Sequence, residues 1–326
     1  MDLNIKDSLL FEEFGYLIDK IKNSPFREAP FKHIIIDDFL SEEHFKEVTS
    51  TEEIKRPVFE RTEDLIDDLL KNGYGVQKFP GCSTSIEAYL EAFNSGEWGT
   101  DKGLLDGFGL TFRLNEYKST ILNRLIDFLN TPEFKKCIEN KFDITDDNYL
   151  ETVFQKYLHG YEISPHPDIR RKAATYMLNL NPHEDSENVN IHTHLLKFTK
   201  EKEYIYDLWK NNKDLDRCWV PWDWCESEYK TTKNNSIVLF SPSDDSLHAI
   251  KLDYDHLLFQ RTQIYGNLWY HDSKSKYPST YHDLESSDID MVKLKSEKQK
   301  ILDLKNVVKK PKKSFLNSII NFRKGK

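Results

Sequence analysis

The chain is poor in cysteine and has no long apolar run. Its four cysteines are too few and too scattered in 326 residues for a disulfide framework, so we interpret all four as reduced thiols. They are Cys82, Cys137, Cys218 and Cys225. No apolar run reaches the ~18 residues of a membrane-spanning helix. The acidic N-terminus lacks the apolar segment of a secretory signal, and we therefore expect a cytoplasmic protein.

Basic residues are scarce in the body of the chain and concentrated at its end. Residues 291–326 contain 12 Lys/Arg and 2 Asp/Glu, which leaves 34 basic and 53 acidic residues, a balance of −19, in residues 1–290. An acidic body is a poor surface for nucleic acid, so no nucleic-acid partner is expected.

The basic tail, residues 309–326, also carries an apolar stripe at helical spacing. The stripe consists of Phe315, Leu316, Ile319 and Ile320. This combination predicts a helix for peripheral membrane or partner contact. A disordered solubilising tail and a helix docked on the acidic body remain alternatives.

Helical patterns dominate the first half of the sequence. Apolar residues recur at helical spacing over residues 7–22, and a short buried strand is predicted at 33–36. Ser41 is a good N-cap for the helix that follows. Eight of the twelve glycines fall in residues 73–110, which favours a loop around a short helix near 86–93. Two further helices are predicted in TILNRLIDFL, capped by Ser119 or Thr120, and in EFKKCIENKF.

From about Asn148 the pattern changes to short β-rich runs separated by turn residues. The runs are ETVFQKYLHGYEI, KAATYMLNLN, HTHLLKF, NSIVLFSP, SLHAIKL and RTQIYGNLWY. Such spacing is typical of an antiparallel sandwich or barrel. The insert 200–232 has three tryptophans within six residues, which predicts a flap packed on the sheet, with an aromatic lid as the alternative.

A His-x-Asp pair, His166 and Asp168, follows one of these runs. Residues i and i+2 of a strand point to the same face, so in a double-stranded β-helix both side chains would project into the barrel mouth. His248, which opens a later strand, is the best third ligand, with His256 as its competitor. Two histidines and a carboxylate form the facial triad of non-haem Fe(II) oxygenases.

Enzymes with this triad commonly use 2-oxoglutarate, whose distal carboxylate needs a cation. Arg261, 13 residues after His248, is the candidate, and Tyr157 is placed to add a hydrogen bond. Tyr176 and Asn179 lie on the strand after the His-x-Asp pair and are further candidates for facing the cofactor.

Other histidines and cations close to these strands are predicted to have structural roles. His192 and His194 form a second i, i+2 pair that we interpret as structural, with pocket lining as the alternative. The run Arg170, Arg171 and Lys172 is predicted to be solvated, unless one of the three contacts an anionic substrate.

The stretch YLHGYEISPHPD resembles the prolyl-4-hydroxylase-like branch of the 2-oxoglutarate/Fe(II) dioxygenases. Tyr157, Gly160, His166 and Asp168 match its Tyr-x-x-Gly, five residues, His-x-Asp pattern. PFKHIIIDDFLSEEHFKEV resembles the N-terminal segment of the same branch. The resemblance covers residues 30–50 and 145–272. The longer gap between His248 and Arg261, Arg in place of the common Lys, and the long insert depart from the family pattern.

The resemblance implies a mainly β fold with an α layer. Its core would be a double-stranded β-helix, jelly-roll or cupin-like, with N-terminal helices packed on it. Residues 1–144 would form the helical layer and first strand. Residues 145–272 would form the catalytic core with its insert, and 273–326 a C-terminal extension.

The implied activity is hydroxylation of a C–H bond, with decarboxylation of 2-oxoglutarate to succinate and CO2. Fe(II), 2-oxoglutarate and O2 would be required, with ascorbate as a supporting reductant. The sequence leaves open a prolyl residue in a protein or a small molecule or sugar as substrate. Two other classes stay open: a non-catalytic β-barrel binding module, and a zinc or other metal-dependent hydrolase.

Overall fold

The computed structural model describes residues 5–77, 85–96, 109–214 and 219–272. By its internal contacts the chain divides into residues 1–278 and 279–326. The second unit, and with it the predicted tail helix 309–326, lies outside the described residues, as do Cys82 and Cys218. Within the described part, no helix is both long and apolar enough to cross a bilayer.

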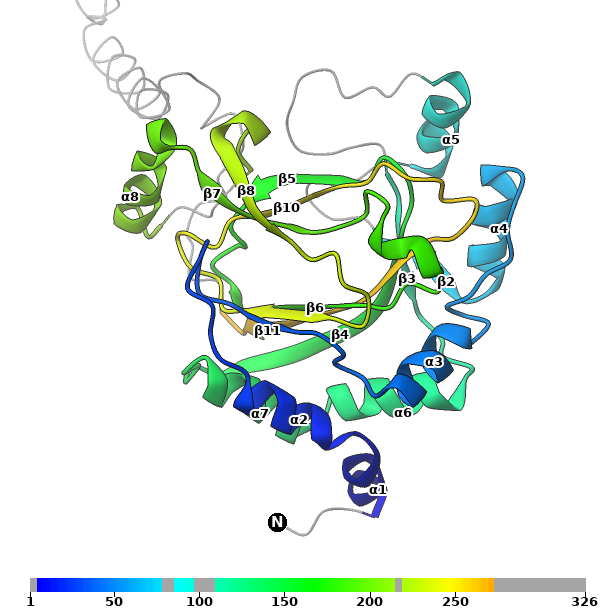
Figure 1. Ribbon diagram of the computed structural model, residues 1–326, viewed down its shortest axis with the longest axis horizontal. Helices are drawn as coiled ribbons and strands as arrows, with labels where there is room; N and C mark the ends of the chain where they lie inside the picture. The colour runs from blue at the N-terminus through cyan, green and yellow to red at the C-terminus, as the bar shows by residue number, and fades with distance from the viewer. Residues whose placement is uncertain (1–4, 78–84, 97–108, 215–218, 273–326) are drawn as a thin grey trace, which may run out of the picture. The chain divides into compact units, whose positions relative to one another are not determined.

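Two antiparallel sheets form the centre of the first unit (Figure 1). The large sheet has seven strands in the order β1 (Ile34–Ile36), β9 (Ile237–Phe240), β6 (Lys172–Asn179), β11 (Arg261–Tyr270), β4 (Asn148–Tyr157), β3 (Thr111–Leu114), β2 (Tyr74–Val76). The small sheet has four, in the order β5 (Glu162–His166), β10 (His248–Lys251), β7 (His194–Phe198), β8 (Cys225–Lys230).

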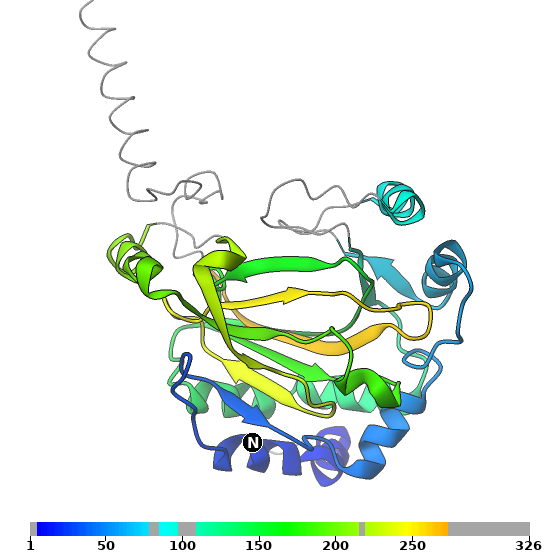
Figure 2. The same ribbon diagram turned by 45° about the horizontal axis from the view of Figure 1, so that its top comes forward.

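The two sheets face each other, as Figure 2 shows from a second angle. Met177, Val238 and Phe240 of the large sheet pack with Leu195 of the small sheet in one buried cluster. Tyr157 and Ile250 belong to a second cluster between the sheets. Side chains alternate between the faces of a strand, so every second residue of β4, β6 and β11 points into the space between the sheets.

Helices cover the outer face of the large sheet (Figure 1). They include α1 (Ile5–Phe14), α2 (Tyr16–Asn23), α6 (Thr120–Leu129) and α7 (Pro132–Lys141). The apolar faces of these helices share one core with Phe154, Leu178, Ile264 and Leu268 of the sheet. The remaining helices are α3 (Glu42–Ser50), α4 (Thr62–Lys71), α5 (Ile86–Ser95) and α8 (Tyr204–Asn211), with short 3-10 turns at Glu184–Glu187, Lys200–Lys202 and Trp222–Trp224.

Most elements agree with the sequence pattern, and the exceptions have physical reasons. Ser41 caps α3 through the backbone N–H of His44, as predicted. The region 7–22 is two helices rather than one, with Gly15 at their junction. The glycine-rich region contributes β2, and the insert contributes α8 and β8. β8 reads CESEYK and has no buried face of its own, so only its pairing with β7 makes it a strand.

Candidate metal centre and its surroundings

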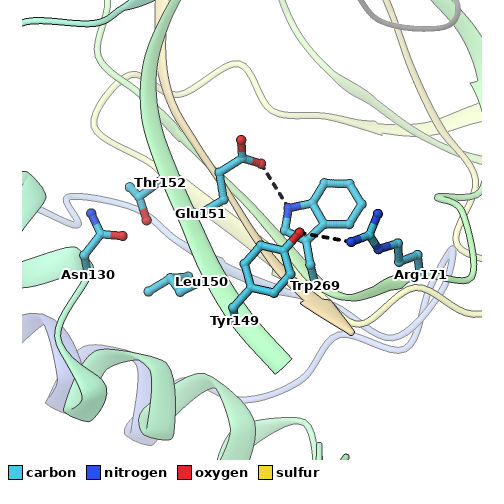
Figure 3. A pocket seen from close by; sticks show the side chains of 7 residues that line it. All are labelled: Asn130, Tyr149, Leu150, Glu151, Thr152, Arg171 and Trp269. Carbon is cyan, nitrogen blue, oxygen red and sulfur yellow. Dashed lines mark hydrogen bonds between the residues drawn. The ribbon is translucent and has the colours of Figure 1, made fainter. Parts of the chain in front are cut away.

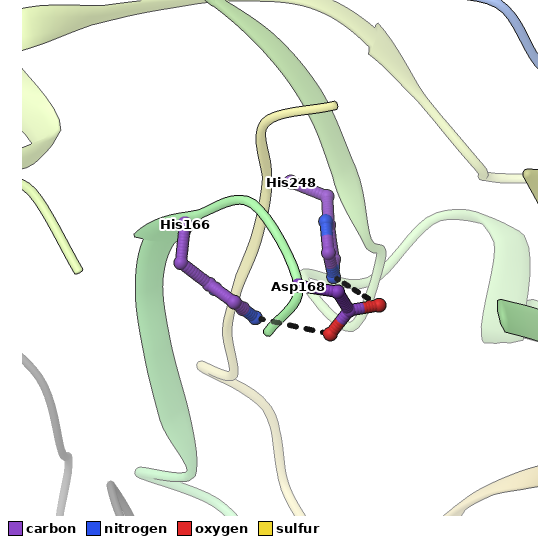
Figure 4. A group of neighbouring side chains, drawn as sticks. All are labelled: His166, Asp168 and His248. Atoms are coloured by element: carbon purple, nitrogen blue, oxygen red, sulfur yellow. Dashed lines mark ion pairs between the residues drawn. The ribbon is translucent and has the colours of Figure 1, made fainter. Parts of the chain in front are cut away.

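His166, Asp168 and His248 come together at the ends of two paired strands. His166 ends β5 and His248 begins β10, and the two residues are partners in the antiparallel register. Asp168 follows His166 by two residues. One potential ligand atom from each of the three lies within 4.8 Å of the others, as Figure 4 shows. The third member of this cluster, called the triad below, is His248, and His256 is not part of it.

Both imidazoles are held in a fixed orientation by backbone carbonyls. His166 Nδ1 lies 2.8 Å from the Ser164 carbonyl oxygen, and His248 Nδ1 lies 3.0 Å from that of Ser246. The Nε2 atoms are left facing Asp168, at 4.0 Å from Oδ1 for His166 and 3.9 Å from Oδ2 for His248. Bonding of one ring nitrogen to a carbonyl is how metal-binding histidines are commonly oriented.

Burial keeps these histidines neutral, as metal ligation requires. Desolvation, and then the neighbouring His248, lowers the pKa of His166 to about 3. Burial likewise lowers the pKa of His248. A neutral imidazole offers a lone pair to a metal, whereas a protonated one does not.

Asp168 is held by two side chains besides the histidines. Lys172 Nζ donates to Oδ1 at 2.5 Å, and the Thr175 hydroxyl donates to Oδ2 at 2.6 Å. Burial alone would raise the pKa of Asp168, but the Lys172 ammonium and the two histidines hold it well below its usual range. The carboxylate is therefore ionised and fixed in position.

The donor set suits a divalent transition metal. Two imidazole nitrogens and one carboxylate oxygen match the facial arrangement that leaves coordination positions open. A neighbouring polar atom also points to a polar ligand: the buried Asn267 amide nitrogen has no hydrogen-bond partner among the described residues. The Thr175 hydroxyl donates its one proton to Asp168 and lies 3.2 Å from the Asn267 carboxamide oxygen. Unpaired buried amides are costly unless a ligand or water completes them.

Arg261 lies in the same interior, at the start of β11. Its guanidinium is 2% exposed, donates to Thr193 Oγ1 at 3.1 Å and lies 4.5 Å from the ring centre of Tyr157. Lys172, the other buried cation of this interior, forms an ion pair with Asp168. Arg261 has no such carboxylate partner among the described residues. Burial lowers the pKa of Arg261 and raises that of Tyr157 to about 12. A buried, uncompensated guanidinium is a fit partner for a ligand carboxylate.

Arg261 and His248 both contact the chain around the start of β7. Thr193, which accepts from Arg261, precedes Leu195 by two residues, and Leu195 is the register partner of His248.

Tyr176 does not face this interior, contrary to the sequence expectation. Its ring lies on the helix side of the sheet, where it packs against Phe134 of α7, and its hydroxyl bonds Thr152 at 2.5 Å. Gly266 makes this placement feasible, because a Cβ there would come within 2.0 Å of the Tyr176 ring. The reason is that successive side chains of β6 point to opposite faces of the sheet. Thr175 and Met177 face the space between the two sheets, so Tyr176 faces the helices.

Asn179 lies on the same face of β6 as Thr175 and Met177, but its side-chain amide already has hydrogen-bond partners within the protein. It donates to the Thr231 and Lys233 carbonyls, at 3.1 and 3.0 Å, and accepts from Gln263 at 2.8 Å. These three hydrogen bonds connect the end of β6 to residues 231–233 and to β11. The position therefore favours a structural role over direct contact with a cofactor.

The other histidines lie outside the triad. His194 points to the outer face of the small sheet, where it contacts Ser227 and Trp222. His192 bonds the Glu187 carbonyl oxygen at 3.0 Å. His256 is buried against Thr62 and Phe93.

The tryptophan-rich insert packs on the small sheet, as the sequence favoured. Trp222 Nε1 donates to Glu162 of β5 at 2.6 Å, and the Val220 N–H donates to the Pro165 carbonyl oxygen at 2.7 Å. The ring centre of Trp219 lies 6.4 Å from that of His166. The insert therefore covers the side of the triad where β5 ends.

Sequence reasoning missed Lys172, Thr175 and Asn267 as neighbours of the triad. Lys172 was expected to be solvated, but its side chain is 9% exposed and bonds Asp168 and Tyr265. Arg170 is equally buried, with its guanidinium on the Trp209 carbonyl oxygen. Strand parity could have identified Thr175, which lies on the strand following Asp168. No local signal identifies Lys172, whose contact depends on a turn.

No protein-family model matches the chain, and no curated protein sequence matches it. Three prolyl hydroxylase structures show a distant likeness. One from Pseudomonas putida is 12% identical, with 64% of this chain and 98% of that chain covered and a TM-score of 0.34.

The second, from Trichoplax adhaerens, was solved in complex with a hypoxia inducible factor peptide fragment. It is 9% identical, the match covers 83% of this chain and 94% of that chain, and the TM-score is 0.35. The third, from Phytophthora capsici, is 10% identical, the match covers 90% of this chain and 77% of that chain, and the TM-score is 0.33. A functional assignment must therefore rest on the geometry of the site.

Proposed function

We propose that the protein is an Fe(II)- and 2-oxoglutarate-dependent oxygenase that hydroxylates a C–H bond. The observation that carries the proposal is a pair of complementary features in one interior. One is the cluster His166, Asp168 and His248, and the other is the buried guanidinium of Arg261 with no described carboxylate partner. A metal centre alone fits several chemistries, whereas a nearby buried cation adds a requirement for an anionic cosubstrate.

In this proposal His166, Asp168 and His248 hold the iron, which when bound supplies oxidation of the substrate by O2 coupled to decarboxylation of 2-oxoglutarate. Arg261 binds the distal carboxylate of 2-oxoglutarate, with Thr193 fixing one end of the guanidinium. Tyr157 supports the guanidinium from one face and adds a hydroxyl. Desolvation in this closed interior strengthens the ion pair with the cosubstrate.

Asp168 keeps its charge through Lys172 and Thr175, so the carboxylate is available as a ligand without a proton loss. The retained carboxylate favours hydroxylation over halogenation, because a halide would need its coordination position.

The two facing sheets support a double-stranded β-helix as the core of the proposed enzyme. We retain as a proposal the division into residues 1–144, 145–272 and 273–326. The substrate is a prolyl or other residue in a protein, or a small molecule or sugar. Ascorbate would act as a supporting reductant, and a cytoplasmic or membrane-peripheral location is part of the proposal.

Succinate formation tests the proposal directly. The full chain is reconstituted with Fe(II) without oxygen, supplied with 2-oxoglutarate and air, and compared with His166→Ala, Arg261→Ala and His194→Ala. Slow uncoupled turnover that the first two changes abolish and the third retains is expected, because His194 is a histidine of the same sheet outside the triad.

The bound iron is measured in parallel. His166→Ala is expected to lose iron and Arg261→Ala to retain it. If the iron-loaded wild type neither binds nor turns over 2-oxoglutarate, the oxygenase assignment is wrong. A β-barrel binding module or a metal-dependent hydrolase then takes its place.

A further inference from the structure

A cavity of about 550 Å³ lies beside the start of β4 and the end of β11, at the opposite end of β11 from Arg261. Figure 3 shows its side chains. They are Asn130, Tyr149, Leu150, Glu151, Thr152, Arg171 and Trp269. None of the proposed iron ligands lines this cavity, and neither does Arg261, the proposed partner of 2-oxoglutarate. The proposed reaction therefore does not account for the cavity.

Arg171 is the uncompensated charge of the cavity. It donates to the Tyr270 carbonyl oxygen and to the Tyr149 hydroxyl, both at 3.3 Å and both to neutral acceptors. No carboxylate of the described residues forms an ion pair with it, whereas Arg170 pairs with Asp244. A guanidinium has five N–H donors, so Arg171 retains donors for a ligand.

The one acidic residue of the cavity does not oppose an anion. Glu151 accepts from Arg113 Nη1 at 2.9 Å and from Trp269 Nε1 at 2.9 Å. Its charge is matched by Arg113, and its oxygens are turned to these two donors. The cavity therefore presents a net positive group within a body whose overall balance is acidic.

Two aromatic rings flank the cation. The Arg171 guanidinium carbon lies 6.0 Å from the ring centre of Trp269, and Tyr149 is 39% exposed. Such faces suit a flat or apolar part of a ligand.

The cavity also adjoins the metal centre. Lys172 Nζ lies 5.4 Å from the ring centre of Trp269 and 2.5 Å from Asp168 Oδ1. Trp269 follows Asn267 by two residues of the same strand, about 7 Å along it. Lys172 therefore lies between the Trp269 ring and Asp168, so a single side chain separates the cavity wall from the candidate metal site.

We propose that this cavity binds an anionic group, a carboxylate or a phosphate, with Arg171 as its partner and an attached ring or apolar segment on Trp269. We assign the cavity to the substrate of the proposed oxygenase, and this assignment rests on that proposed function. The binding of the anion does not depend on that function.

The test uses the metal-free full chain and three probes: benzoate, inorganic phosphate and the neutral benzamide. Binding is measured by calorimetric titration at low salt. Benzoate is expected to bind and benzamide to bind at least ~10-fold more weakly, because a hydrogen bond between two charged groups is stronger than one to a neutral amide. Arg171→Gln is expected to weaken benzoate and phosphate by ~10-fold or more.

Arg170→Gln is the matched control. It removes the same charge one residue away, where the guanidinium points to Trp209 and Asp244. It is expected to leave benzoate binding within about twofold of wild type, since Arg170 is already paired with Asp244 and does not line the cavity. Anion binding that both variants leave unchanged, as a site on the basic tail would give, overturns the proposal. No saturable binding of either anion overturns it as well.

A second measurement needs no variant. Nuclear Overhauser contacts from the benzoate ring are expected to the Trp269 indole and the Tyr149 ring, and contacts only to other residues overturn the proposal. The two proposals fail separately. Anion binding that depends on Arg171 without 2-oxoglutarate turnover leaves the site and removes the oxygenase. Turnover that depends on Arg261, together with benzoate and phosphate binding that Arg171→Gln leaves unchanged, leaves the oxygenase and removes the anion site.

Discussion

Lys172 and Asp168 form a buried ion pair with Nζ 2.5 Å from Oδ1, and each side chain is less than a tenth exposed. Lys172 also donates to the Tyr265 hydroxyl at 2.7 Å. Burial would lower the pKa of Lys172, but the Asp168 carboxylate raises it well above its usual range. A candidate metal ligand is thus paired with a fixed protein cation.

Lys172→Met should destabilise the metal-free protein by ~3–5 kcal/mol, because it leaves the Asp168 carboxylate buried without its partner. A divalent metal should restore more stability to the variant than to wild type, since the ion replaces the lost charge and binds only the folded state. Urea unfolding with and without Mn(II) measures both effects. Equal stabilisation of the two proteins by the metal would show that Lys172 and the metal do not share Asp168.

Lys156 should make stability depend on pH. Its ammonium is fully buried on the Ile54 carbonyl oxygen and Thr262, and burial lowers its pKa to about 7. Between that value and the unfolded pKa of ~10.4, the unfolded chain binds more protons. Stability should therefore rise with pH over this range, by at most ~1.4 kcal/mol per unit.

Lys156→Met should flatten this slope in urea unfolding at a series of pH values. Lys135→Met, which removes a part-exposed lysine paired with Glu139, should leave it unchanged. An unaltered slope in Lys156→Met would assign the pH dependence to other groups.

Arg261→Gln should raise the KM for 2-oxoglutarate by ~10- to 100-fold, because charged hydrogen bonds to a carboxylate contribute ~1.5–3 kcal/mol. Arg261→Lys should fall between the variant and wild type, since an ammonium keeps the charge but not the two-donor geometry. Succinate formation over a range of 2-oxoglutarate concentrations measures this. A KM that is the same in all three proteins would place the cosubstrate elsewhere.

Tyr157→Phe and Tyr176→Phe form a matched pair. Each removes one buried hydroxyl, from β4 and from β6, the two strands on either side of β11. Tyr157 contacts Arg261, so its change should raise the KM for 2-oxoglutarate. Tyr176 bonds Thr152 on the helix side, so its change should cost ~1 kcal/mol of unfolding free energy and leave the KM unaltered. The reverse pattern would contradict the assignment of the two faces.

The sequence by itself determined the features that depend on local geometry. The period of a strand puts alternate side chains on one face, so the pattern of β-rich runs predicted β6, β9 and β11 closely. The run ETVFQKYLHGYEI instead joined most of β4 to the start of β5. Ser41 could be identified as a cap because its hydroxyl bonds a backbone N–H three residues on. The family pattern added the order of His166, Asp168, His248 and Arg261 along the chain.

Only the tertiary structure decided which face of each strand is the interior and which distant residues meet. The period of two cannot say whether Tyr176 or its neighbours point inward, because that depends on the helices packed against one side of the sheet. The meeting of His248 with His166 depends on the pairing of β10 with β5, and that of Lys172 with Asp168 on a turn. These contacts arise from long-range packing, which no short stretch of sequence encodes.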